Sequence, residues 1–273
     1  KLSIYIMVLT LFFSGCDFHK PPEEVDLDLI YDEIPPYSEA TSFAPYDYDT
    51  FRPVIDRSKL QLYYDGVAID YGGFDNYKSS NFYVDSDENL HFTIDKVPET
   101  YKTRAELREG PDLYSWSTAD LEGHYWVATL RCLKPAKGVS SYTWMQIHGT
   151  SDTYNYPIIR LLWEREKNDA YDHLWAVTIL SDPYSNNIYE YTDLGPRPDG
   201  FFSAEVHVRN NIMDILINHT LIKTYNVTYW QEIQNYYKAG VYINRFGDGG
   251  EVSAIFKSLN FFDDPSNIVA AHH

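Results

Sequence analysis

Three stretches of the sequence place polar side chains two residues apart, with apolar or small residues between them. The first, TRAELREG, alternates Arg104, Glu106 and Arg108 with Ala105 and Leu107. A β-strand turns successive side chains to opposite faces, so this spacing predicts a strand with one charged face and one core face. The charged face would offer two guanidinium groups and a carboxylate for ion pairs and hydrogen bonds.

The other two stretches repeat the pattern. WMQIHG separates Gln146 from His148 by Ile147. YYKAGVYINRF puts four residues on one face of a strand, namely Lys238, Gly240, Tyr242 and Asn244. If the three strands lie in one curved sheet, their polar faces form a concave groove lined with hydrogen-bond donors.

Each stretch also has an ordinary structural explanation. A row of two arginines and a glutamate can be a solvated ion-pair face, which contributes little to stability. A single His148 can be a structural histidine, and Tyr242 can be a packing residue. Periodicity therefore does not by itself join the three stretches into one site.

Taken together, the blocks RAELRE, QIH and YYKAGVYIN resemble the signature blocks of polysaccharide lyase family 7, the alginate lyases. That family shows R-[ST]-E-[LV]-R, Q-[IV]-H and Y-[FY]-K-A-G-x-Y-x-Q in this order. Here about 40 residues separate the first two blocks, and about 90 more lead to the third. The resemblance covers residues 51–273 and implies a β-jelly-roll with an active groove on its concave sheet.

Two residues depart from the family blocks. Ala105 stands where the family has Ser or Thr, and Asn244 stands where it has Gln. Ala105 is expected to face the core, where the change has little consequence. Asn244 is expected to face the groove, where its shorter amide affects substrate preference.

The resemblance implies β-elimination along a 1,4-linked uronate chain. Removal of the C5 proton beside a carboxylate builds negative charge, so positioned donors must hold that carboxylate. Arg104 and Gln146 match the family's carboxylate neutralisers, His148 matches its base and Tyr242 its acid. On mannuronate, where C5–H and O4 lie on the same side, Tyr242 can serve as both base and acid.

Four further residues are assigned to substrate binding, namely Glu106, Arg108, Lys238 and Asn244. Glu106 is expected to orient the two arginines of its strand, and Arg160 to extend the basic groove. The resemblance implies no metal and no organic cofactor, because Arg and Gln neutralise the carboxylate that a Ca²⁺ ion neutralises in other lyases.

Strand signals recur from residue 51 to the C-terminus, for example in NLHFTIDKV, HYWVATLRCL and LWAVTIL. Aromatic residues make up 16% of the chain and favour strands. Turn residues such as Asn210-Asn211 separate the strands, and TYWQEIQNYY is the best short helical candidate. The pattern predicts an all-β domain over 51–273, a β-jelly-roll sandwich of two antiparallel sheets with a concave active groove.

The N-terminus has the pattern of an exported bacterial lipoprotein. LSIYIMVLTLFFSGC is an apolar run that ends in small residues before Cys16, which predicts a signal peptide over 1–16 and lipid on Cys16. A buried helix with a chance cysteine is the alternative. Residues 17–50 are acidic and rich in proline, so we expect a tether. The protein is then placed at the outer membrane or cell surface, in contact with the membrane only through its lipid.

The charge balance narrows the possible partners. Lys and Arg number 22 against 40 Asp and Glu, so the net charge is −18. Such a chain is unsuited to nucleic-acid binding, which needs clustered basic residues. The expected partner is an anionic polysaccharide, alginate or a related uronan, bound by a monomer. At ~0.15 M salt the screening length is ~8 Å, so a local basic groove outweighs the distant negative charge at contact.

Two other functions stay open at this point. A lyase of the same fold could act on another polyuronate such as glucuronan, because Asn244 departs from the family block. A lectin-like domain could bind glycans on the same concave sheet without any chemistry. The joint presence of a candidate base and acid argues against the lectin, since binding alone requires neither.

Overall fold

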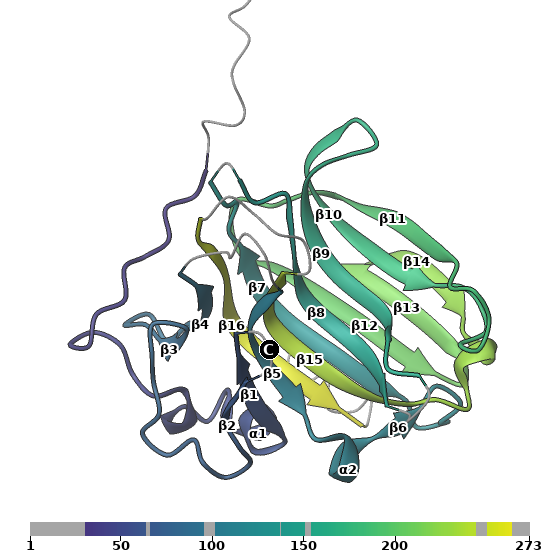
Figure 1. Ribbon diagram of the computed structural model, residues 1–273, viewed down its shortest axis with the longest axis horizontal. Helices are drawn as coiled ribbons and strands as arrows, with labels where there is room; N and C mark the ends of the chain where they lie inside the picture. Colours follow the sequence, from purple (N-terminus) through teal and green to yellow (C-terminus); the bar gives the residue numbers. More distant parts are fainter. Residues whose placement is uncertain are drawn as a thin grey trace, which may run out of the picture.

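The computed structural model describes residues 31–63, 66–95, 102–136, 138–150, 154–243 and 250–263, and these residues form a sandwich of two antiparallel sheets (Figure 1). The larger sheet, over the described residues, has nine strands in the order β11-β10-β9-β8-β15-β5-β1-β2, with β6 paired to β15. Its strands are β1 (Ser58–Leu62), β2 (Gly66–Ile69), β5 (Thr103–Glu109), β6 (Trp116–Ser117), β8 (Ser141–Thr150), β9 (Pro157–Lys167), β10 (Ala170–Ile179), β11 (Tyr189–Pro196) and β15 (Gln234–Ile243).

The smaller sheet, again over the described residues, has seven strands in the order β14-β13-β12-β7-β16-β4-β3. Its strands are β3 (Phe82–Val84), β4 (Leu90–Ile94), β7 (His124–Cys132), β12 (Phe202–Arg209), β13 (Ile212–Ile217), β14 (Thr220–Asn226) and β16 (Val252–Phe262). The all-β jelly-roll sandwich predicted from the strand pattern is confirmed.

The core lies between the two sheets and is filled by aromatic and branched side chains. Four tryptophans are among its largest fully buried residues: Trp126, Trp144, Trp163 and Trp230. In β5, Ala105 and Leu107 are 0% exposed, whereas Arg104 and Arg108 on the other face are partly exposed. The expected orientation of TRAELREG is therefore confirmed, because only the charged face of this strand looks out of the core.

Two-residue turns join several neighbouring strands. Asn210 and Asn211, between β12 and β13, have φ of 49° and 62°. Asn168 and Asp169 have φ of 51° and 64° between β9 and β10. Two successive positive φ angles match the type I′ turn, whose twist suits antiparallel strands and which favours Asn. The predicted turn at Asn210-Asn211 is confirmed.

The described helical segments are short: α1 (Arg52–Asp56), α2 (Pro111–Tyr114), and the 3₁₀ turns η2 (Pro45–Asp47) and η3 (Thr228–Trp230). Of the short helical candidate TYWQEIQNYY, only the 3₁₀ turn η3 forms before β15 begins at Gln234. Trp230 and Ile233 are buried in the core, and the residues that follow pair with β8. Strand pairing overrides the weak local helical pattern. Among the described residues, none of these helices has the length and apolarity needed to cross a membrane.

The expected tether includes residues that contact the sandwich. The Asp32 amide donates to the Lys134 carbonyl at 3.0 Å, and the Asp32 carboxylate lies 3.1 Å from Arg197. Phe43 pairs with Val84 of β3 through two backbone hydrogen bonds. Folded structure thus begins before residue 51. Cys16 and the rest of the predicted signal peptide lie outside the described residues.

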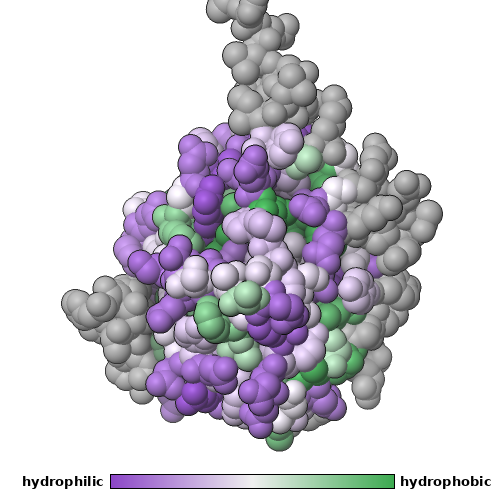
Figure 2. All heavy atoms as spheres, turned by 90° about the vertical axis from the view of Figure 1, so that its left-hand side faces the viewer, coloured by the Kyte–Doolittle hydropathy of each residue, from purple (hydrophilic) through white to green (hydrophobic). Residues whose placement is uncertain are grey.

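The face that carries the N-terminal segment and β1 to β4 shows hydrophilic residues interspersed with smaller hydrophobic patches (Figure 2). It is the left-hand side of Figure 1, and the polar residues cover most of it. The open face of the larger sheet, which carries β5, β8 and β15, lies toward the viewer in Figure 1.

Candidate active site

The three polar stretches lie on adjacent strands of the larger sheet, with β15 between β5 and β8. Lys238 is the register partner of Arg108 on β5 and of Gln146 on β8. Tyr242 pairs with Arg104 in the same way, and Tyr236 pairs with His148. Partners in adjacent strands project from the same face, so the sheet gathers the three polar faces into one surface, as the sequence predicted.

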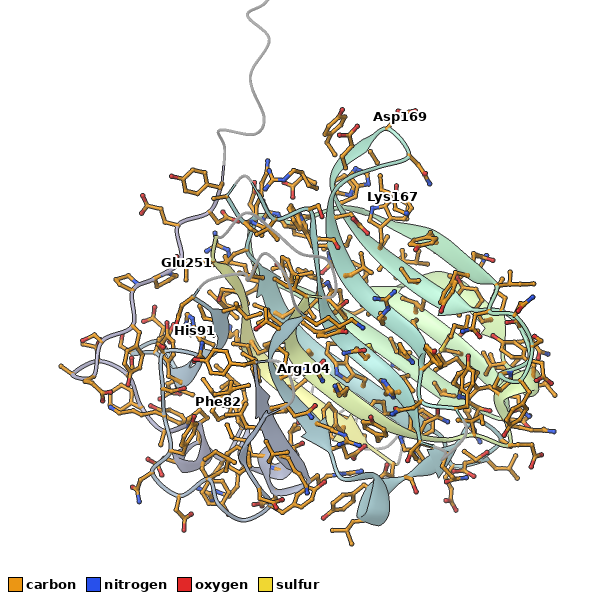
Figure 3. The ribbon with its side chains drawn as sticks, viewed as in Figure 1. Phe82, His91, Arg104, Lys167, Asp169 and Glu251 are labelled. Carbon is orange, nitrogen blue, oxygen red and sulfur yellow. The ribbon has the colours of Figure 1, made fainter. Side chains whose placement is uncertain are left out.

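A cavity of about 280 Å³ opens on this surface. All four residues assigned to catalysis line it: Arg104, Gln146, His148 and Tyr242. The other lining residues are Lys102, Asn155, Tyr156, Pro157, Arg160, Tyr189 and Lys238. Glu106 and Arg108 are not part of the lining, and Asn244 lies outside the described residues. Figure 3 shows Arg104 near the middle of the sheet.

Glu106 does not line the cavity but binds two of the residues that do. Its carboxylate is 2% exposed and accepts hydrogen bonds from Gln146 Nε2 at 2.5 Å and from Lys238 Nζ at 2.6 Å. Arg104 approaches it only to 3.8 Å. Glu106 was expected to orient the two arginines of its own strand. Instead it fixes Lys238 on the adjacent strand β15 and Gln146 on β8, one strand further, because its register partner on β15 is Gly240, which has no side chain.

Arg108 also differs from expectation. Its guanidinium lies 4.9 Å from the centre of the Tyr236 ring, a cation–π contact. Tyr236 in turn stacks on His148, with ring centres 5.3 Å apart and planes 29° apart. Arg108 therefore contacts Tyr236, whose ring stacks on the imidazole of His148, and does not itself line the cavity.

His148 is held as a neutral base. Its Nδ1 lies 2.9 Å from the Gly149 carbonyl, and a carbonyl only accepts, so Nδ1 carries the proton and Nε2 the free lone pair. Burial, followed by the charge of Lys238, lowers the pKa of His148 to about 3. The imidazole is therefore uncharged at neutral pH and able to accept a proton.

Tyr242 is held as a neutral acid. Burial raises the pKa of its hydroxyl above the ordinary value, and the guanidinium of Arg104 opposes this without reversing it. That guanidinium lies 4.9 Å from the ring centre and donates to Gln61 Oε1 at 3.3 Å. Arg104 is thus steadied on two sides while its side chain lines the cavity.

Lys238 is a buried ammonium group beside the cavity. Burial lowers its pKa to about 8, although the Glu106 carboxylate favours the charged form. Its positive charge therefore persists at neutral pH and weakens on the alkaline side. The cavity is cationic because its described lining includes Arg104, Arg160 and Lys238 and no Asp or Glu, although the chain is strongly acidic overall.

Several lining residues were not found from the sequence. Arg160 was expected to extend the basic groove, and it does line the cavity as a partly buried residue of β9. Lys102 and Tyr156 lie just outside strands, and Tyr189 begins an edge strand. The alternation that marks one face of a strand does not extend to such positions. Their place at the cavity is therefore seen only in the folded chain. The described residues contain no group of three or more His, Cys, Asp or Glu side chains arranged to hold a metal ion.

Comparison with known proteins places this geometry in a family. The family model described as Alginate lyase matches residues 58–263. An alginate lyase from Photobacterium sp. (strain ATCC 43367) is 26% identical over 302 aligned positions, covering 95% of this chain and 96% of that protein.

Solved structures show the same fold. Alginate lyase AlyC3 superimposes with a TM-score of 0.70 at 23% identity, over 84% of this chain and 99% of that one. The family 7 alginate lyase A1-II′ gives a TM-score of 0.62 at 20% identity, over 81% and 98%. The family model covers most of the chain and includes every described residue of the cavity, so this protein belongs to the alginate lyase family.

Proposed function

We propose that this protein cleaves alginate by β-elimination and leaves 4,5-unsaturated uronate ends. The observation that carries the proposal is the single cavity that brings a neutral base, a neutral acid and two carboxylate-binding groups together. Family membership and the names of the relatives support alginate as the substrate, and AlyC3 is known in complex with dimannuronate.

The carboxylate at the cleavage site is held by Arg104 and Gln146. Arg104 offers a planar fork suited to a carboxylate. Gln146 has two N–H donors, of which Glu106 takes one and the substrate the other. These donors stabilise the charge that develops when the proton on C5 leaves.

The proposed elimination removes one proton from C5 and delivers one proton to the departing oxygen. Nε2 of His148 accepts the proton from C5, and the electron pair of the C5–H bond forms the C4–C5 double bond. The C4–O bond breaks, and the Tyr242 hydroxyl donates its proton to the departing oxygen. This division suits guluronate, where C5–H and O4 lie on opposite sides. On mannuronate, Tyr242 serves as both base and acid: its oxygen takes the C5 proton as its own hydroxyl proton passes to O4, so Tyr242 begins and ends the step as a neutral phenol.

The test uses the purified protein on alginate, polyguluronate, polymannuronate and glucuronan, followed by the ultraviolet absorbance of the unsaturated ends. We expect activity on alginate and losses of about 10²–10⁴ in kcat for His148→Ala and Tyr242→Phe. His148→Ala should retain more activity on polymannuronate than on polyguluronate. Near-normal turnover of either variant on every active substrate would show that its assigned role is wrong. Glucuronan lyase activity and simple glycan binding are not favoured by family membership.

We also propose that the protein is an exported lipoprotein, on the strength of the apolar run that ends at Cys16. Lipid on Cys16 would hold the catalytic domain at the cell surface. Cys16→Ala should move the protein from the membrane fraction to the soluble fraction, with Cys132→Ala as a control that leaves partition unchanged. Equal membrane partition of the Cys16→Ala variant and the unmodified sequence would exclude lipid anchoring at this residue.

A further inference from the structure

The cavity runs across the strands of the larger sheet. Its lining begins with Arg104 on β5 and ends with Tyr189 on β11, at the edge of the sheet. One row of register partners follows the same direction: Lys238, Gln146, Arg160, Val177 and Tyr191. Adjacent strands lie ~4.8 Å apart, so Tyr191 is roughly 19 Å from Lys238 along this row. A polymer bound across the strands therefore passes over Arg160 toward Tyr191.

The turn between β9 and β10 folds toward this end of the groove. Ala170, at the turn, packs against a small apolar cluster on the same face, made of Leu162, Trp175 and Val177. Lys167, at the end of β9, reaches the same place. Figure 3 shows Lys167 and Asp169 at this turn, well away from Arg104 at the centre of the sheet.

Lys167 contacts two aromatic rings. Its Nζ lies 3.5 Å from the centre of the Tyr191 ring and 5.9 Å from the centre of the Trp175 ring. Among the described residues, no carboxylate lies within ion-pairing distance of Lys167. Several other described lysines are paired, for example Lys223 with Glu190 at 2.8 Å. In a chain with 40 acidic and 22 basic residues, a lysine that pairs with no acid of the described part and lies at the end of a cationic groove indicates an anionic ligand.

We propose that Lys167 binds the carboxylate of a uronate unit outside the cavity, at an outer subsite on the β11 side of the groove. Tyr191 positions the ammonium by a cation–π contact, and Tyr191 itself remains 39% exposed beside Tyr189, which is 44% exposed. The polymer then spans from the cleavage site past Arg160 to Lys167. Long chains use this subsite, and short oligomers that fill only the cavity do not. The inference rests on the proposed polyuronate cleavage.

Chain-length dependence is the test. For Lys167→Ala, kcat/KM on polymeric alginate and on long oligouronates should fall about tenfold, the loss of one charge-assisted contact. On the shortest oligomers that are cleaved, kcat/KM should not change. Tyr191→Phe keeps the ring and should resemble the parent protein, whereas Tyr191→Ser should follow Lys167→Ala. Lys257→Ala, an equal charge change at an exposed position of β16, is the matched control and should have no effect.

A loss for Lys167→Ala that is equal at all chain lengths, or no loss at any length, would overturn the outer subsite. Calorimetric binding of long and short oligouronates to Tyr242→Phe, with and without Lys167→Ala, measures the same contact without turnover. If the parent protein cleaved no uronan, the proposed function would fail, and this binding experiment would still decide the subsite. Weaker binding of long oligomers alone supports it, and unchanged binding refutes it.

Discussion

At the scale of single residues, the role proposed for His148 as the base requires a neutral imidazole ring. Burial and the charge of Lys238 lower its pKa to about 3, so the neutral form is present above that pH and is lost as the pH falls through it. We expect kcat/KM on a short oligouronate to stay nearly flat from roughly pH 7 down to pH 5. An ordinary histidine, with a pKa of ~6.5, would become protonated within this range. An acid limb with its midpoint near pH 6.5 would show that His148 titrates normally.

Substitution of Arg104 tests whether this residue binds the carboxylate at the cleavage site. Arg104→Lys keeps the charge but loses the planar fork, so kcat should fall roughly 10²–10³-fold, along with weaker binding. Steady-state kinetics on alginate measure both kcat and KM. Ala105→Ser, at the adjacent core-facing position, is the control and should change turnover little. The opposite ranking of the two variants would mean that the charged face of β5 is an ordinary solvated surface.

Sequence patterns located four residues that line the cavity but not all of their contacts. Alternation shows that Glu106 shares a face with Arg104, and the family resemblance supplies the roles. Neither shows which strand lies beside β5, and the partners of Glu106 depend on that. Its carboxylate meets Gln146 and Lys238 because β15 and then β8 lie next to β5.

At the scale of elements, β15 depends on a glycine between its two functional residues Lys238 and Tyr242. Gly240 has φ of +136°, and a Cβ there would lie 2.3 Å from the Ala105 carbonyl oxygen. Gly240→Ala should therefore destabilise the protein by at least ~1–3 kcal/mol, because both the backbone and β5 must shift. Activity should fall as well, since Tyr242 moves with the strand.

Denaturant unfolding measures this effect, with Gly200→Ala as the matched control. Nothing lies within 4 Å of a Cβ built on Gly200, so that variant should change the unfolding free energy by less than ~0.5 kcal/mol. Equal stability of the two variants would show that β15 tolerates a side chain at Gly240.

Strands and turns were more predictable than the segment boundaries. Period-2 alternation and turn residues are local signals, so β5, β8, β15 and the Asn210-Asn211 turn follow from them. The position at which folded structure begins is set by contacts between distant parts of the chain, and no local pattern marks it. Asp32 and Phe43 belong to an acidic, proline-containing segment, and their contacts with Arg197 and Val84 come from distant parts of the chain.

At the scale of the whole molecule, a net charge of −18 opposes the approach of a polyanion. The cationic groove acts at contact, whereas the remaining charge acts over longer distances. Raising the ionic strength first screens the long-range repulsion and then the contacts themselves. We expect kcat/KM on polymeric alginate to pass through a maximum as salt increases. A steady decline from the lowest salt would indicate that the groove dominates at every distance.

The chemical structure of the ends made from alginate tests the proposed chemistry most directly. Mass spectrometry and proton NMR of the products distinguish elimination from hydrolysis. Elimination adds no water and leaves a double bond between C4 and C5 of the new non-reducing end. We predict unsaturated ends from the parent protein and almost none from Tyr242→Phe under the same conditions. Saturated ends that have gained one water per cleavage, or no cleavage of alginate at all, would contradict β-elimination by Arg104, Gln146, His148 and Tyr242.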